Sequence, residues 1–291
     1  MNEFVTCEGV VKIFKLEDIE VVALQGLDIA VERGEIVAVI GPSGAGKSTL
    51  LNVLGALDVP SAGKARVAGE SLVKMPPKTR LRYRRTTVGF VWQNVSRNLI
   101  PYLTAVENVQ VPMLLGGAVD TTRAEYLLDL VGLAHRRHHR PRQMSGGEQQ
   151  RVAVAVALAN APNVLLADEP TGNLDTENAY RVLDVFRSVR DETGVTIVIV
   201  THDMRLASAV DRYVQILDGK TSTEAVRRDE AEHDHYVLLD SAGRLQIPED
   251  LRAAYGMQGR VKIIEEDGRI IVVPGDAAGD GVGDDEGSQG R

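Results

Sequence analysis

A nine-residue segment rich in glycine restricts the fold of this 291-residue chain more than any other feature. Residues 41–49 read GPSGAGKST; they follow the apolar run Ile36–Ile40 and precede a helical pattern over residues 49–57. The pattern G-x-x-x-x-G-K-S/T between a strand and a helix is typical of loops whose backbone N–H groups surround phosphate oxygens. Because such a loop follows a buried parallel strand, the segment predicts an α/β domain.

Each part of this loop has a chemical purpose. The glycines let the backbone curl around phosphate, Lys47 places a positive charge on the β- and γ-phosphates, and the Ser48 hydroxyl can ligate Mg²⁺. A chance glycine-rich turn is the alternative, which the strand and helix on either side disfavour. The residues that we expect to contact nucleotide are Gly41, Ser43, Gly44, Ala45, Gly46, Lys47, Ser48 and Thr49.

A second motif complements the loop. Residues 164–169, VLLADE, form an apolar strand that ends in two acids, and α/β sheets bind their ligands at such carboxyl ends. We expect Asp168 to hold Mg²⁺ through water, and Glu169 to orient or deprotonate an attacking water molecule. Alone, the two residues would be equally consistent with solvated acids; beside a phosphate loop we favour the catalytic interpretation.

Alternating strand and helix patterns extend over residues 1–221. Residues 164–167 and 196–200 are short runs of Val, Leu, Ile and similar residues, typical of parallel strands with both faces covered. Between them Thr176–Thr193 has helical spacing with one apolar face. Residues 222–235 are polar and carry no apolar period, which predicts a linker, or a helix followed by a linker. The apolar face of the helix predicted at Thr176–Thr193 consists of Val182, Val185, Phe186 and Val189.

Residues 236–274 predict a small, mainly-β C-terminal unit. Pro248 stands at the start of a short predicted helix and Gly256 at its end. Asp267-Gly268 between two β-rich runs is typical of a two-residue hairpin turn. About 39 residues bury too little surface to fold alone, so the unit must pack on something, and a second copy is the simplest partner. We expect the acidic, glycine-rich tail, residues 275–291, to be disordered.

Composition excludes several classes of function. A net charge of −8 disfavours non-specific nucleic-acid binding, which needs clustered positive charge. The single cysteine, Cys7, excludes an internal disulfide and any CxxC metal site. The sequence contains no run of 18 apolar residues and no basic leader followed by an apolar core, so we expect a cytosolic chain that does not span a membrane.

Residues 144–151, MSGGEQQR, resemble the signature of ABC ATPases, in its LSGGE variant. Ser145 and two glycines open a helix, so that free N–H groups and a hydroxyl face an anion. The resemblance implies that this second anion site binds the γ-phosphate held by the other subunit, so two chains are needed to complete two sites. A serine-capped helix start is the alternative. The implied signature residues are Ser145, Gly146, Gly147 and Glu148.

Other segments resemble further elements of the same family, in the expected order. Gln93 resembles the Q-loop residue that reaches Mg²⁺ and senses the transporter; Asp175 resembles the D-loop aspartate at the opposite subunit's site. His202, after a predicted strand, resembles the switch histidine on the γ-phosphate, and Phe14 resembles the aromatic that stacks on adenine. A buried core phenylalanine is the alternative for Phe14. The resemblance thus implies catalytic roles for Glu169, His202 and Gln93, and metal contacts for Ser48, Gln93 and Asp168.

The amino-acid sequences of four segments, residues 50–52, 55–58, 102–109 and 166–175, resemble those of the lipoprotein-release and macrolide-export ATPases in particular. Met144 and Trp92 replace the usual Leu and Phe, and Val156 stands where Arg is common; none of these removes a catalytic group. The resemblance implies a homodimeric, Mg²⁺- and ATP-dependent ATPase at the cytoplasmic face of the cell membrane. Lacking spanning segments, it would contact the membrane only through a separate transmembrane permease, with no nucleic-acid partner.

Residues 236–274 resemble a different family, the AbrB-type swapped-hairpin domains, through residues 239–252 and the hairpin that follows. That resemblance implies an intertwined homodimer; many members bind DNA, which leaves an ATP-switched DNA-binding regulator as the alternative function. The unit carries six acidic and five basic residues. Because a DNA-reading dimer is expected to be basic, we favour dimerisation.

Overall fold

The computed structural model describes residues 3–16, 19–172, 174–207, 209–228, 233–240 and 243–275. The chain divides into two compact units, residues 1–246 and residues 247–291. Over the described ranges, no helix combines the length and apolar character that crossing a membrane requires. Apart from its first residue, the tail predicted to be disordered lies outside these ranges.

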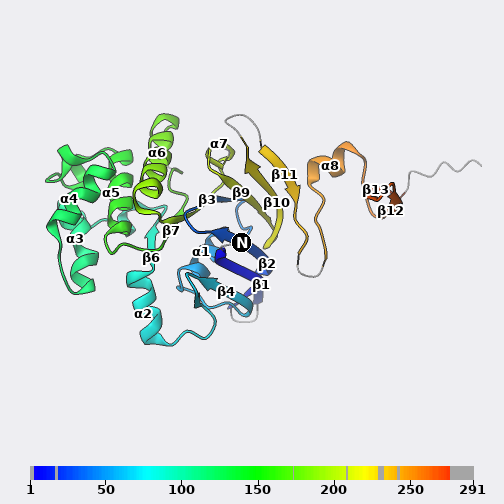
Figure 1. The fold of residues 1–291 in the computed structure, drawn as a ribbon, viewed down its shortest axis with the longest axis horizontal. Coiled ribbons are helices and arrows are strands. Elements are labelled where there is room, and N and C mark those ends of the chain that lie inside the picture. Colours follow the sequence, from blue (N-terminus) through cyan, green and yellow to red (C-terminus); the bar gives the residue numbers. More distant parts are fainter. Residues whose placement is uncertain are drawn as a thin grey trace, which may run out of the picture. The chain divides into compact units, whose positions relative to one another are not determined.

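The larger sheet of the first unit is mixed. Five strands run parallel in the order β9-β3-β8-β7-β6, and β10 and β11 continue the sheet beyond β9 in antiparallel pairing (Figure 1). Its strands are β3 (Ile36–Ile40), β6 (Val88–Val91), β7 (Val164–Asp168), β8 (Thr196–Thr201), β9 (Arg212–Leu217), β10 (Lys220–Arg227) and β11 (His233–Val237).

A smaller, antiparallel sheet in the order β2-β1-β4-β5 completes the β structure of this unit. Two long strands dominate it and pair along most of their length. Its strands are β1 (Glu3–Leu16), β2 (Ile19–Glu32), β4 (Ala62–Val67) and β5 (Glu70–Ser71).

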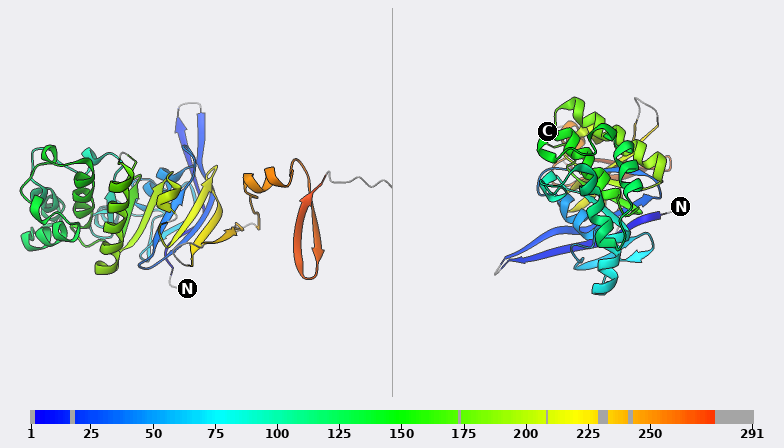
Figure 2. Two further views of the ribbon diagram at one scale, coloured as in Figure 1. Left: turned by 90° about the horizontal axis from the view of Figure 1, so that it is seen from above. Right: turned by 90° about the vertical axis from the view of Figure 1, so that its left-hand side faces the viewer.

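The helices separate into two groups around the larger sheet. Helices α3 to α6 gather on one side of the unit, away from β1, β2 and β4 (Figures 1 and 2). Their apolar residues share one core with the larger sheet, whereas α1 and the smaller sheet share a second core with its other face. The α-helices are α1 (Lys47–Leu54), α2 (Pro77–Thr86), α3 (Ala105–Gly116), α4 (Thr121–Leu130), α5 (Gly146–Leu158), α6 (Thr176–Thr193) and α7 (Met204–Ala207). Short 3₁₀ turns are η1 (Val95–Arg97), η2 (Ala134–Arg136) and η3 (Pro141–Gln143).

Strand β3 shows why the predicted parallel strands read as unbroken apolar runs. Ile36, Ala38 and Ile40 point into the core with the helices, and Val37 and Val39 into the core with α1. All five residues are buried, because both faces of the strand are covered. The predictions for β3, β7, β8 and the helix Thr176–Thr193 are confirmed, and with them the α/β fold class.

The linker predicted at residues 222–235 was wrong where the structure describes it. Residues 222–227 belong to β10 and residues 233–235 to β11, both paired into the larger sheet. Ser222 and Ala225 are completely buried although the segment has no apolar period. The first unit accordingly extends to residue 246 rather than 221, and Tyr236 and Val237, assigned from the sequence to the C-terminal unit, belong to β11.

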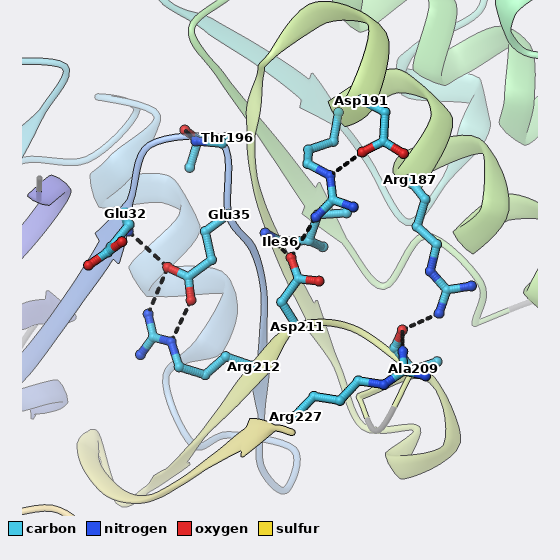
Figure 3. A network of polar contacts seen from close by, with 12 residues as sticks. Glu32, Glu35, Ile36, Arg187, Asp191, Thr196, Ala209, Asp211, Arg212 and Arg227 are labelled. Atoms are coloured by element: carbon cyan, nitrogen blue, oxygen red, sulfur yellow. Dashed lines mark hydrogen bonds and ion pairs between the residues drawn. The ribbon is translucent and has the colours of Figure 1, made fainter. Parts of the chain in front are cut away.

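An ion-pair network explains how such a polar strand joins the sheet. Arg212 Nε of β9 lies 2.6 Å from the carboxylate of Glu35, just before β3, and Arg212 Nη1 lies 3.2 Å from that of Glu224 in β10. Nearby, the Ala209 carbonyl accepts hydrogen bonds from Arg187 of α6 and Arg227 of β10 (Figure 3). Because Arg212 of the neighbouring strand compensates the charge of Glu224, this carboxylate is accommodated in β10 without an apolar pattern around it.

The second unit contains α8 (Glu249–Ala254) and the hairpin of β12 (Val261–Glu266) and β13 (Arg269–Pro274). Pro248 precedes α8, and Gly256, with φ of +62°, follows it, as predicted. Asp267 and Gly268 both have positive φ, which is the geometry of the predicted two-residue turn. The resemblance to AbrB-type domains stays a prediction.

Candidate nucleotide-binding and catalytic site

The glycine-rich loop joins β3 to α1, so it begins at the carboxyl end of a fully buried strand. Lys47 is the first residue of α1 and is only 8% exposed. Its Nζ donates hydrogen bonds to the carbonyl oxygens of Gly41 (2.8 Å) and Pro42 (3.0 Å). The ammonium group is thereby held within the loop's own backbone, where the motif predicts contact with phosphate.

Two glycines of the loop are required by their neighbours. A β-carbon at Gly46, where φ is +97°, would overlap the carbonyl oxygen of Ala23 in β2. A β-carbon at Gly41 would overlap the carbonyl oxygen of Ile216 in β9. Both sheets therefore press on the loop so closely that no side chain fits at either position.

Ser48 and Asp168 bring two of the predicted metal contacts together. The Ser48 hydroxyl donates a hydrogen bond of 3.1 Å to Asp168 Oδ1, across from α1 to the end of β7. Partial burial raises the pKa of Asp168 above its ordinary value, and nearby Glu169 adds to the rise. The Ser48 hydrogen bond and the positive charges of Lys47 and Arg97 oppose that rise.

These oxygen donors fit Mg²⁺. A hydroxyl and one carboxylate are typical of magnesium sites that take their remaining ligands from phosphates and water. In the described part of the chain no three His, Cys, Asp or Glu residues cluster as a metal cage would require. A cation at this site would take its remaining ligands from phosphate oxygens and water.

Glu169 and His202 meet at the ends of two neighbouring strands. His202 Nδ1 lies 2.7 Å from Glu169 Oε2; the carboxylate is 13% exposed and the imidazole 65%. The contact is not aligned as a hydrogen bond, so among the described residues this buried carboxylate oxygen has no hydrogen-bond donor. The backbone of Glu169 has φ of +46°, a conformation that costs a non-glycine residue about 1–3 kcal/mol and is concentrated at functional sites.

The signature segment forms a capped helix start. Ser145 Oγ accepts a hydrogen bond from the Glu148 backbone N–H (3.2 Å), and Glu148 Oε2 accepts one from the Ser145 N–H (2.8 Å). Arg136 adds a hydrogen bond of 3.0 Å to the Glu148 carboxylate. The backbone hydrogen bond is the main cause that lowers the pKa of Glu148.

Asp175, the predicted D-loop aspartate, immediately precedes α6, and Asn178 connects it to the predicted signature segment. Asp175 caps α6 by accepting hydrogen bonds from the Asn178 N–H (2.9 Å) and the Asn178 side-chain amide (2.7 Å), which lower its pKa. Asn178 Oδ1 would lie 2.9 Å from a β-carbon at Gly147. The amino ends of α5 and α6 are thus in direct contact. Asn173, within the predicted D-loop, lies outside the described residues.

Aromatic stacking defines the segment around Gln93. Phe90 and Trp92 stack with ring centroids 3.9 Å apart, and the Arg97 guanidinium lies 3.9 Å from the Trp92 ring centre. The Gln93 amide nitrogen lies 3.7 Å from where a β-carbon of Gly172 would be. No motif pointed to Arg97 or Asn178; only the fold brings them to the catalytic segments.

Phe14 lies on β1 and pairs with Val21 of β2. Val21 is two residues before Ala23, whose carbonyl oxygen lies against Gly46 of the loop. Its ring is only half-buried and carries Lys12 Nζ 4.7 Å above it. This exposure disagrees with the alternative of a buried core residue, while stacking on adenine stays a prediction.

The geometry therefore assembles most of the predicted groups along one sheet edge. The loop, Asp168-Glu169 and His202 follow β3, β7 and β8, which are adjacent in the order β3-β8-β7. Ser145 and Asp175 instead form a second cluster at the starts of α5 and α6. A phosphate cradle, a buried carboxylate and an adjacent histidine define a nucleotide-hydrolysing P-loop protein.

Comparison with known proteins agrees with this class. A family model described as ABC transporter matches residues 24–172. An uncharacterized ABC transporter ATP-binding protein of Thermotoga maritima is 47% identical over 223 residues, covering 76% of this chain and 94% of that protein. The lipoprotein-releasing system ATP-binding protein LolD of Ruegeria pomeroyi is 48% identical over 209 residues, covering 71% and 91%.

A solved structure shares the fold. The ATP-binding cassette MJ0796, described as dimeric in a post-hydrolysis state bound to ADP and Pi, is 36% identical with a TM-score of 0.70, covering 78% of this chain and all of that one. The chain therefore belongs to the ABC transporter family, as an ATP-binding and ATP-hydrolysing subunit.

Proposed function

We propose that two copies of this chain bind two Mg²⁺–ATP molecules between them, hydrolyse ATP and drive a separate membrane permease from the cytoplasmic face of the membrane. The contact between Glu169 and His202, beside the lysine-bearing loop, is the single observation that carries the proposal. In this contact the candidate general base, Glu169, lies beside the candidate γ-phosphate ligand, His202.

Glu169 is proposed as the general base. Its buried Oε2 has no hydrogen-bond donor among the described residues, so it is free to accept a proton from an attacking water molecule. His202 lies close enough to orient that carboxylate and is exposed enough to reach a γ-phosphate. Lys47 would leave the carbonyl oxygens of its own loop and bind the β- and γ-phosphates.

Ser48, Asp168 and Gln93 are proposed to hold the cation. When bound there, the cation would supply positive charge that offsets the negative charge developing during phosphoryl transfer. Asp168 Oδ1 accepts a hydrogen bond from the Ser48 hydroxyl in this structure, so Ser48 Oγ and Asp168 Oδ1 already lie side by side.

The proposed pairing of two chains follows from the separate positions of the glycine-rich loop and the signature segment, the two candidate anion sites. The signature residues cap α5 and contact α6, whereas the glycine-rich loop lies at the carboxyl end of β3. We propose that Ser145 and its neighbours complete the site of a second copy, with Asp175 beside them. The dimeric state described for MJ0796 supports this arrangement.

Replacing the proposed base tests the catalytic assignment. Glu169→Gln keeps the shape of the side chain and removes the proton acceptor, so we expect ATP binding to persist and turnover to fall by about 10²–10⁴-fold. Phosphate release and ATP affinity are measured on the same preparation. Glu192→Gln, the same change at an exposed position of α6, serves as the control and should keep full activity. Normal turnover in Glu169→Gln would remove Glu169 from this role.

A further inference from the structure

Arg97 is a cation beside the catalytic segments that has no part in the function proposed above. Its guanidinium carbon lies 3.9 Å from the centre of the Trp92 ring, and Trp92 itself stacks on Phe90. The Arg97 side chain is exposed and has no hydrogen-bond or ion-pair partner among the described residues. An unpaired guanidinium held on an aromatic ring is available to bind an anion.

Strand pairing places Arg97 next to the proposed metal site. Strand β6 runs parallel to β7, and Val91 at the end of β6 pairs with Ala167. The next residue on each chain segment, Trp92 and Asp168, therefore lie beside each other at the carboxyl end of the sheet. The positive charge of Arg97 reaches the Asp168 carboxylate and lowers its pKa, against the larger effect of burial. Arg97 accordingly lies at the edge of the sheet where we propose that phosphate binds.

Hydrogen bonds hold this arginine close to the end of β6. The Asn98 side chain accepts a hydrogen bond from the Trp92 backbone N–H (2.9 Å) and donates one to the Phe90 carbonyl oxygen (2.7 Å). The backbone N–H of Arg97 donates to the Asn94 carbonyl oxygen (2.9 Å) within η1. Because its backbone is already fixed, Arg97 loses less conformational entropy on binding an anion than an arginine on a free loop.

The position of Arg97 indicates which phosphate it fits. In the sheet order β3-β8-β7-β6, the glycine-rich loop follows β3 and Arg97 follows β6, on the far side of Asp168 and Glu169. A nucleotide held by the loop would present its terminal phosphate toward these two acids. The acids and Mg²⁺–ATP are all negatively charged, and Lys47 alone does not balance them. Because a planar guanidinium binds phosphate oxygens in pairs, the γ-phosphate is the anion that Arg97 fits.

We propose that Arg97 binds the γ-phosphate of ATP and makes the site prefer ATP to ADP, with the Trp92 ring as the platform that holds its guanidinium. The inference rests on the proposed function, from which it takes the position of the nucleotide, and deepens it by adding a residue that distinguishes a nucleoside triphosphate from a diphosphate.

Affinities for two nucleotides test this preference in the full-length chain. Titration calorimetry with Mg²⁺ gives the dissociation constants of ADP and of a non-hydrolysable ATP analogue for the wild type, Arg97→Gln and Arg84→Gln. Arg97→Gln removes a charge-assisted phosphate contact, so we expect the dissociation constant of the analogue to rise at least about tenfold and that of ADP less than about threefold. Arg84 is likewise exposed but lies on α2, so Arg84→Gln is the matched control and should change neither constant.

The platform is tested by a second substitution. Trp92→Leu leaves Arg97 in place and removes the ring beneath it. We expect the dissociation constant of the analogue to rise by about two- to fivefold, since a cation–π contact at an exposed position is lost, while that of ADP stays constant. An unchanged affinity for the analogue would remove Trp92 from this role.

Two results with Arg97→Gln would overturn the proposal. One is an affinity for the analogue equal to that of the wild type. The other is an equal loss of affinity for the analogue and for ADP, which a purely structural role of Arg97 predicts. A wild type that binds neither nucleotide, or that hydrolyses no ATP, would instead contradict the proposed function, so the two failures are distinguishable.

Discussion

Strands β3 and β13 both contain an unbroken run of apolar residues and differ completely in their surroundings. IVAVI in β3 is buried at every position, because helices cover one face of its sheet and α1 with the smaller sheet covers the other. RIIVVP in β13 pairs with β12, and none of its residues is buried. The comparison shows that an apolar strand becomes a core only when other elements of the chain cover it.

The same substitution in the two regions should change stability by very different amounts. Ile197→Lys in β8 places a charge in a completely buried strand, so we expect it to lower the free energy of unfolding by about 4 kcal/mol or more and to leave little soluble protein. Ile263→Lys in the hairpin should shift the main unfolding transition by less than about 1 kcal/mol. Denaturant unfolding followed by circular dichroism measures both. Comparable losses would mean that the hairpin is part of the main cooperative unit.

Replacing one lysine in each region compares a side chain predicted to bind phosphate with one exposed on the surface. Lys47 is buried and hydrogen-bonded within the loop, whereas Lys262 is exposed on β12. Lys47→Ala should weaken ATP binding about 10- to 100-fold, since a charge-assisted phosphate contact is lost. Lys262→Ala should leave ATP affinity unchanged. Titration calorimetry checks both, and unchanged affinity in Lys47→Ala would contradict the assignment of the loop.

The smallest expected effect concerns the capped start of α5 and its dependence on pH. Because the pKa of Glu148 is lowered in the folded chain, its ionised form contributes stability above the unfolded pKa, about 4.3. That contribution is lost as the pH falls through the folded pKa.

Glu148→Gln should therefore be less stable than the wild type at pH 7, by about 1 kcal/mol as for other caps, and the difference should shrink below about pH 4. Thermal unfolding at both pH values tests this; a constant difference would mean that the charge is irrelevant. Glu249→Gln in the exposed α8 is the control in the second unit and should change neither value.

Local patterns in the sequence determined the elements that carry the chemistry. The run Ile36–Ile40, the helix Thr176–Thr193 and the Asp267-Gly268 turn depend on neighbours within a few residues, and the structure agrees with each. Backbone conformation and amphipathic spacing act over this short range, which is why they are readable without a fold.

Tertiary structure alone decided the placement of β10 in the sheet and of Arg97 at the site, which local patterns do not indicate. Residues 222–235 read as a linker because β10 is held mainly by strand pairing and by the ion pair between Arg212 and Glu224, with the small residue Ala225 in the core. Arg97 joins the site only because it stacks on Trp92 at the end of β6. Burial and charge compensation depend on groups far apart in the sequence, so they exist only once the sheet has brought those groups together.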